Sequence, residues 1–121
     1  MNVKDFRRLK VWQKAHLLTL NVYETTRKFP KEELYGLTTQ MRRSSSSIPT
    51  NIAEGCGRAG DAEFARFLQI AMGSASELEY ELILSRDLHY LSLDEYENLN
   101  RETVEVKRML GPFIGKLKAD R

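Results

Sequence analysis

Cysteine is almost absent from this sequence: Cys56 is the one thiol among 121 residues. A single cysteine cannot form an intramolecular disulfide, and a Cys-rich zinc site needs several thiolates. The sequence therefore excludes a disulfide-stapled secreted domain and a zinc site of that type. A lone cysteine is compatible with a reducing compartment, so we expect a cytoplasmic protein.

Proline, glycine and long apolar runs are also scarce. No stretch approaches the roughly 18 apolar residues of a membrane span, and the charged first ten residues lack the apolar run of a signal peptide, so we expect no membrane association. Only three prolines and seven glycines favour helix over sheet. With 41% hydrophobic residues, the composition predicts one all-α domain spanning residues 1–121.

Residues that carry chemistry are few. Neither His16 nor His89 has the Glu-x-x-His spacing of a bundle di-iron site, and no His or Cys cluster has metal-ligand spacing. No glycine-flanked nucleophile turn or phosphate-binding loop surrounds a serine or cysteine. We expect no enzyme activity, no metal and no cofactor, and we interpret Cys56 as a small residue at a helix end.

Four segments have apolar residues at every third or fourth position, which is the spacing of amphipathic helices. They run from about residue 9 to 28, from about 31 to 54, from about 62 to 91, and from residue 93 onward. The third follows the spacing of a coiled-coil seam. Four such helices with short connections predict an antiparallel, up-down-up-down four-helix bundle.

The second segment contains four consecutive serines and then Pro49. Local propensity favours a loop here about as strongly as a helix. The apolar row nevertheless keeps its helical phase through the proline; its members are Leu34, Leu37, Met41, Ser45, Ile48 and Ile52. A proline inside a helix removes one N–H donor and bends the axis. The unbroken phase predicts one helix, kinked at Pro49 and ending near Gly55 and Gly57.

The start of the fourth helix has a specific signal. Ser92 and Glu95 have the spacing of a capping box, in which each side chain bonds the backbone N–H of the other residue. Leu91 and Tyr96 are placed to form the accompanying hydrophobic staple.

The first segment has more apolar surface than one bundle needs. Beside its main stripe lies a second flank: Leu9, Trp12, His16, Leu20 and Tyr23. The third segment has surplus apolar residues as well. Such a surplus predicts self-association, usually into a closed symmetric oligomer.

A polar row lies opposite the apolar row of the second segment and comprises Arg43, Ser47, Asn51, Glu54 and Arg58. Two interpretations stay open. The row is either a solvated face or a hydrogen-bonded seam between subunits, for which arginine and asparagine side chains are suited. Our candidate subunit-interface residues are Trp12, Arg43, Asn51, Glu54 and Arg58.

Charge is divided between the two halves of the chain. Residues 1–60 hold 11 Lys/Arg and 5 Asp/Glu, and residues 61–121 hold 8 and 12, so the halves carry +6 and −4. This asymmetry suits an anionic partner or contact between copies. The candidate phosphate contacts are Arg7, Arg8, Lys10 and Lys14, although such a row can also be only solvated surface.

Three segments carry a family resemblance: residues 6–18 (FRRLKVWQKAHLL), 29–58 (FPKEELYGLTTQMRRSSSSIPTNIAEGCGR) and 64–91 (FARFLQIAMGSASELEYELILSRDLHYL). They resemble the four-helix-bundle protein family encoded in 23S rRNA intervening sequences. The resemblance implies a homopentameric ring. It also implies a relationship to the accessory variability protein of diversity-generating retroelements, which associates with a reverse transcriptase and nucleic acid. The positions that match the family pattern, with an implied structural role, are Gly36, Leu37, Arg43, Pro49, Asn51, Glu54, Gly55 and Arg58.

From these observations we expect a non-enzymatic, oligomeric helical bundle that binds RNA or DNA as an accessory protein. The alternative is a protein-interaction scaffold without nucleic-acid affinity, including an accessory subunit of a reverse transcriptase.

Overall fold

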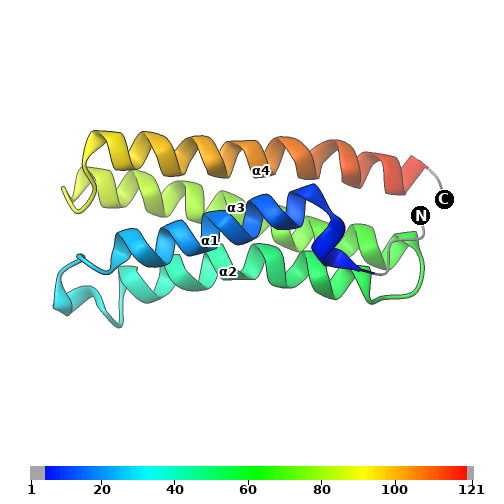
Figure 1. The fold of residues 1–121 in the computed structure, drawn as a ribbon, viewed down its shortest axis with the longest axis horizontal. Helices are drawn as coiled ribbons and strands as arrows, with labels where there is room; N and C mark the ends of the chain where they lie inside the picture. The colour runs from blue at the N-terminus through cyan, green and yellow to red at the C-terminus, as the bar shows by residue number, and fades with distance from the viewer. Residues whose placement is uncertain (1–4, 120–121) are drawn as a thin grey trace.

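The computed structural model describes residues 5–119, and all regular structure in that range is helical. The elements are η1 (Phe6–Arg8), α1 (Lys10–Thr26), η2 (Lys31–Glu33), α2 (Leu37–Cys56), α3 (Asp61–Asp87) and α4 (Leu93–Ala119). Figure 1 shows the chain passing along the long axis four times and reversing at each connection. The predicted all-α fold with four long helices is confirmed.

Each long helix packs against two others: α1 contacts α2 and α4, and α3 contacts the same two helices. The apolar stripes of all four helices meet in one core. The apolar residues that give α3 its coiled-coil spacing are all buried: Phe64, Leu68, Ala71, Ala75, Leu78 and Leu82. In α4, four residues that follow the same kind of spacing are buried as well: Leu99, Thr103, Val106 and Leu110. The helical spacing in the sequence therefore identified the core faces correctly.

The start of α2 differs from the sequence expectation. We expected a helix from about residue 31 with Leu34 in its apolar row, but α2 begins at Leu37 and Leu34 is 45% exposed. Residues 31–33 form a separate 3-10 turn. The Glu33 carboxylate accepts a hydrogen bond from the backbone N–H of Leu37 at 3.2 Å. It thereby satisfies one of the free donors at the start of α2.

Helix α2 continues through Pro49 to Cys56 as one element, so the loop alternative was wrong. Proline has no N–H to donate to the carbonyl four residues earlier, which belongs to Ser45. That carbonyl accepts a hydrogen bond from the Thr19 hydroxyl of α1 at 3.0 Å. The hydroxyls of Ser44, Ser45 and Ser46 bond carbonyls three residues earlier in α2. A neighbouring helix thus supplies the donor that Pro49 lacks.

The connection between α3 and α4 confirms the capping box. The backbone N–H of Ser92 donates to Glu95 Oε1 at 2.8 Å, and that of Glu95 donates to Ser92 Oγ at 3.1 Å. Helix α3 ends at Asp87, earlier than the expected residue 91. The chain turns at His89, whose φ of 64° lies in the left-handed region, and the N–H of Tyr90 bonds the Ser85 carbonyl at 2.9 Å. This geometry terminates a helix.

None of the helices within residues 5–119 combines the length and the apolar character that crossing a bilayer requires.

Candidate functional site

The basic first half of the chain and the acidic second half form two different sides of the bundle, because each half folds into two neighbouring helices. Because η1, α1, η2 and α2 come from the first half of the chain, and α1 packs on α2, they form one side, which we call the basic side. Its residues 5–60 carry ten Lys/Arg and five Asp/Glu. Helices α3 and α4 form the acidic side, in which residues 61–119 carry seven and eleven. Opposite sides of one molecule therefore differ in charge sign.

The four candidate phosphate-binding residues lie together around the start of α1, and all four are exposed. Two of them form ion pairs with acidic side chains. Arg7 Nε lies 2.9 Å from Asp5 Oδ1, and this hydrogen bond lowers the pKa of Asp5. Lys14 Nζ lies 2.7 Å from Glu105 Oε1 and links α1 to α4. Arg8 and Lys10 form no ion pair with any other residue in 5–119.

The polar row on α2 divides into an inner part and exposed ends. The hydroxyls of Ser47 and Ser74 are 2.9 Å apart, and Asn51 Nδ2 donates to the Ser47 carbonyl at 2.8 Å. The Ser47–Ser74 bond joins α2 to α3 inside one protomer, whereas the Asn51 bond lies within α2. At the exposed end, Glu54 and Arg58 form an ion pair at 3.3 Å. Arg43, at the other end, is also exposed.

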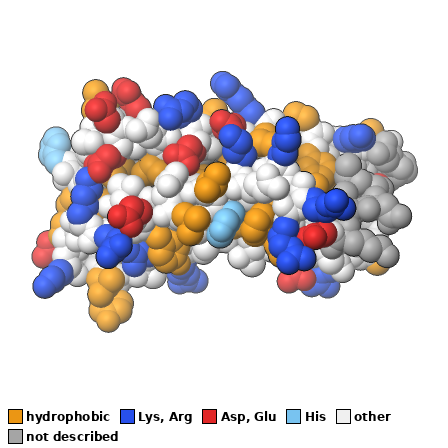
Figure 2. Space-filling view, in the orientation of Figure 1, with side chains coloured by type: hydrophobic (Ala, Val, Ile, Leu, Met, Phe, Trp, Pro, Cys, Tyr) orange, Lys and Arg blue, Asp and Glu red, His pale blue; other side chains and the backbone are white. Residues whose placement is uncertain are grey.

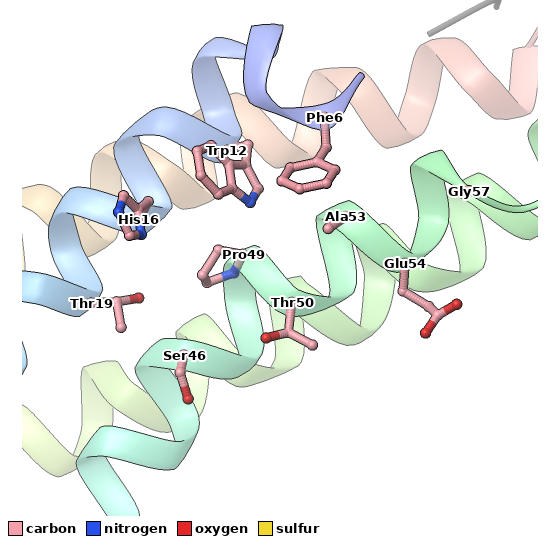
Figure 3. Close-up of a pocket in the computed structure, with 10 residues that line it drawn as sticks. All are labelled: Phe6, Trp12, His16, Thr19, Ser46, Pro49, Thr50, Ala53, Glu54 and Gly57. Atoms are coloured by element: carbon pink, nitrogen blue, oxygen red, sulfur yellow. The ribbon is translucent and has the colours of Figure 1, made fainter. Parts of the chain in front are cut away.

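A groove of about 590 Å³ runs between α1 and α2 (Figure 3). One wall holds three rings: Phe6 and Trp12 have centroids 5.0 Å apart, and Trp12 and His16 are stacked at 5.0 Å with planes inclined by 10°. The facing wall is part of α2 and includes Ser46, Pro49, Thr50, Ala53 and Glu54. Trp12 is half-buried and His16 is exposed. Trp12, a predicted interface residue, therefore lines a groove of the basic side.

Sequence reasoning placed Trp12 and His16 on one flank but missed Phe6. Phe6 precedes α1, in the 3-10 turn η1, whose Asp5 N-cap accepts a hydrogen bond from the N–H of Arg7 at 3.1 Å. This turn folds Phe6 back against Trp12. Helical spacing does not reach across such a turn, so the sequence carried no signal for it.

A second residue that the sequence reasoning missed is Glu81 in α3. Its side chain is 4% exposed, and Ser44 Oγ lies 2.6 Å from Glu81 Oε1. Burial raises the pKa of Glu81, the Ser44 hydrogen bond opposes that rise, and the charge of Glu77 adds to it. A signal existed: Glu81 lies three residues after Leu78 and four before Ser85, both of which are buried. The buried stripe of α3 thus includes one acid.

Replacing Glu81 by glutamine is expected to increase the free energy of unfolding at pH 7 relative to the parent chain, and the gain is expected to shrink toward pH 4. A carboxyl whose pKa is raised by folding stabilises the native state only below that pKa, and this contribution is lost as the pH rises through it. Glutamine retains the contact with Ser44 and is never charged. Urea unfolding of both proteins between pH 4 and pH 8 measures the difference; a constant difference would contradict the assignment.

Within residues 5–119, no group of three or more His, Cys, Asp and Glu side chains is placed to hold a metal ion. Cys56 is the last residue of α2 and is buried, where burial raises the pKa of its thiol. A thiol in this setting is a weak nucleophile. The sequence interpretation of Cys56 as a small residue at a helix end agrees with its position.

Residues 7–112 match the model of the 23S rRNA-intervening sequence protein family. The chain belongs to this family. The predicted family resemblance is therefore confirmed.

A solved structure supports the same fold. The crystal structure of a protein of unknown function of the S23 ribosomal protein family, from Bacteroides thetaiotaomicron VPI-5482, superimposes with a TM-score of 0.81. The two sequences are 27% identical, and the match covers 87% of this chain and 95% of the other. No curated protein matches this chain. The comparisons thus establish the family and its helical-bundle fold, and the protein in this crystal structure is itself described as having unknown function.

Proposed function

We propose that this member of the 23S rRNA-intervening sequence protein family is a non-enzymatic, self-associating bundle that binds RNA or DNA through its basic side. The observation that carries the proposal is the arrangement of charge. Arg8 and Lys10 are exposed without an acidic partner among the described residues, and the surrounding helices add further cations. Exposed cations of this kind bind phosphates and release condensed counterions.

The ion pairs of Arg7 and Lys14 still allow these side chains to bind phosphates. The pairs Arg7–Asp5 and Lys14–Glu105 are solvent-exposed, and exposed ion pairs contribute little to stability. A phosphate can therefore replace the carboxylate at little cost. Because each copy carries a net charge of only +2, binding gains strength when several copies present their basic sides together.

The expected result for nucleic acid is an affinity that falls steeply with salt. For a structured RNA hairpin, a plot of log affinity against log salt has a slope of about −0.9 for each phosphate contacted. The double variant Arg8→Ala/Lys10→Ala is expected to reduce the magnitude of the slope by about one to two. Arg101→Ala/Arg108→Ala removes the same charge from exposed positions of α4 and is the matched control. An absence of binding even at low ionic strength would refute the proposal.

Self-association has its own support in exposed apolar side chains. Leu17, Leu20 and Tyr23 of α1 are 55%, 50% and 43% exposed, and Ile70 and Tyr80 of α3 are 41% and 61% exposed. Apolar residues thus lie on both the basic and the acidic side. Opposite charges favour contact between the basic side of one copy and the acidic side of the next. Such head-to-tail contacts form a ring when the rotation between successive copies closes, and we propose the pentamer that the family resemblance implies.

Sedimentation at tens of micromolar is expected to show particles larger than the 14.0 kDa chain. Leu20→Glu places an acid on the basic side where it would face the acidic side of the next copy, and is expected to weaken association by about tenfold or more. Tyr35→Glu is the control, because Tyr35 is 94% exposed and precedes α2. A monomer at this concentration, or equal weakening by both variants, would contradict the assignment.

The outer ends of the polar row extend this proposal. Arg43, Glu54 and Arg58 are exposed and remain available to a neighbouring copy, whereas Trp12 is half-buried in the wall of the groove. Asn51 is satisfied within its own protomer by the Ser47 carbonyl. We propose that Asn51 supports the interface indirectly: its Nδ2 also donates to Ser47 Oγ at 2.9 Å, and this holds in place the hydroxyl that bonds Ser74 of α3.

The second candidate function is a protein-interaction scaffold without nucleic-acid affinity, of which an accessory subunit of a reverse transcriptase is one form. The exposed leucines and tyrosines favour it, because they suit a protein surface. This second function would be contradicted if the protein binds RNA and affinity purification from the host recovers no protein partner. For either function we propose a cytoplasmic location, in which the lone Cys56 stays reduced.

A further inference from the structure

The groove between α1 and α2 combines two features that charge-driven binding does not require. It lies on the basic side, and one of its walls is a run of three rings, Phe6, Trp12 and His16. The Arg7 guanidinium lies 5.8 Å from the centre of the Phe6 ring, at the start of this run. Figure 2 shows Lys and Arg side chains interspersed with hydrophobic and acidic ones on the viewed face, with a histidine near its middle.

The ring wall is suited to flat, apolar ligands with a charged backbone. Unpaired bases stack on aromatic side chains regardless of sequence, while cations nearby hold the phosphates. Paired bases are not available for such stacking, because their faces are covered by neighbours in the duplex. An aromatic wall therefore distinguishes single strands from duplexes, which phosphate contacts alone do not.

The opposite wall supports the same ligand. Pro49 and Ala53 of α2 face the rings across the groove (Figure 3) and offer apolar contact to a base that enters it. Thr50 and Glu54 add a hydroxyl and a carboxylate at the same wall. A carboxylate accepts hydrogen bonds from exocyclic amino groups of bases. Arg58 pairs with Glu54 at 3.3 Å while its guanidinium lies over the Phe67 ring of α3, 5.0 Å from the ring centre.

We propose that this groove binds unpaired nucleotides of a single-stranded RNA or DNA, with a base stacked against the Trp12–His16 pair and its phosphates held by Arg7 and neighbouring cations. The inference rests on the proposed nucleic-acid binding and specifies its ligand as single-stranded. His16 ends the ring stack and is exposed, so it is the side chain that a base reaches first.

The chain provides its own reporter, because Trp12 is its one tryptophan. A 12-nucleotide single-stranded RNA is titrated into the protein at low salt while Trp12 fluorescence is followed, and a duplex of the same length is titrated in parallel. Single strands are expected to quench Trp12, and duplexes to bind without quenching. His16→Ala is expected to weaken single-strand binding about 5-fold to 100-fold, measured by anisotropy of a labelled RNA, and to leave duplex binding unchanged.

Tyr35→Ala is the matched control, since Tyr35 is an aromatic side chain that is 94% exposed, precedes α2 and does not line the groove; it is expected to change neither affinity. Equal binding of both RNAs with constant Trp12 fluorescence would overturn the stacking site but leave charge-driven binding intact. No binding of either RNA would overturn both proposals. Fluorescence that depends on protein concentration and ignores RNA would show that a second copy covers the groove, and would overturn the stacking site.

Discussion

Gly55→Ala is expected to lower the free energy of unfolding by about 1–3 kcal/mol, the usual cost of overpacking a core. An added Cβ at Gly55 would lie 2.9 Å from Phe64 Cδ1 and 3.0 Å from Phe67 Cβ. Phe64 is 4% exposed and packs edge-on against Phe113 of α4 at 5.3 Å, so it cannot move aside freely. The close approach of α2 and α3 at this point requires a glycine. Urea unfolding at one fixed protein concentration measures the change.

Gly73→Ala is the matched control, because Gly73 is an exposed glycine inside α3 and an added Cβ there would meet no neighbouring atom within 4 Å. Here alanine adds only helix propensity, and a gain of about 0.5–1 kcal/mol is expected. The two glycine substitutions should therefore change the free energy of unfolding in opposite directions. A stabilising Gly55→Ala would show that the two helices do not approach as closely as described.

Thr19→Val is expected to cost about 1–3 kcal/mol, although valine has nearly the same shape. The Thr19 hydroxyl donates to the Ala15 carbonyl at 2.9 Å and to the Ser45 carbonyl at 3.0 Å. The Ala15 carbonyl belongs to a regular turn of α1, but the Ser45 carbonyl is the one that Pro49 leaves without its helical donor. Valine removes the replacement donor and leaves a buried acceptor unsatisfied. Thermal and urea unfolding are the measurements.

Thr103→Val is the control for Thr19→Val, because it removes a buried hydroxyl that does not replace a missing helical donor. Thr103 is fully buried, and its hydroxyl donates at 2.7 Å to the Leu99 carbonyl of its own helix. That carbonyl already accepts the regular helical bond, so a cost below about 1 kcal/mol is expected. Equal costs for the two threonine substitutions would mean that the Thr19 bond does not compensate for Pro49.

The sequence predicted most of the fold because its main determinants are local. The apolar spacing identified four helices, and the capping box at Ser92 and Glu95 is formed by residues three positions apart. The phase of the α2 row correctly indicated a helix through Pro49. The errors fall at helix ends, where non-helical turns intervene. Leu34 and the last residues before α4 kept the apolar spacing but lie in connections.

The candidate site was predicted only in part. The sequence named Trp12 and the four cations around the start of α1, and these lie on the basic side. It did not show that Glu105 of α4 pairs with Lys14, because those residues are distant in the chain. It likewise did not show that Phe6 folds back onto Trp12, or that Ser47 of the polar row bonds Ser74 of α3. Each of these contacts depends on which elements pack together.

By itself the sequence determined the number of helices, their buried faces, the family and the division of charge between the two halves, since each follows from neighbouring residues or from residue order. Only the tertiary structure decided that the two halves become opposite sides of one bundle. It also decided that the Thr19 hydroxyl of α1 bonds the Ser45 carbonyl, which has no helical donor because of Pro49. The tertiary structure likewise decided that Phe6, Trp12 and His16 line a groove. These features arise from contacts between helices, and helical spacing along one segment contains no information about which neighbour it meets.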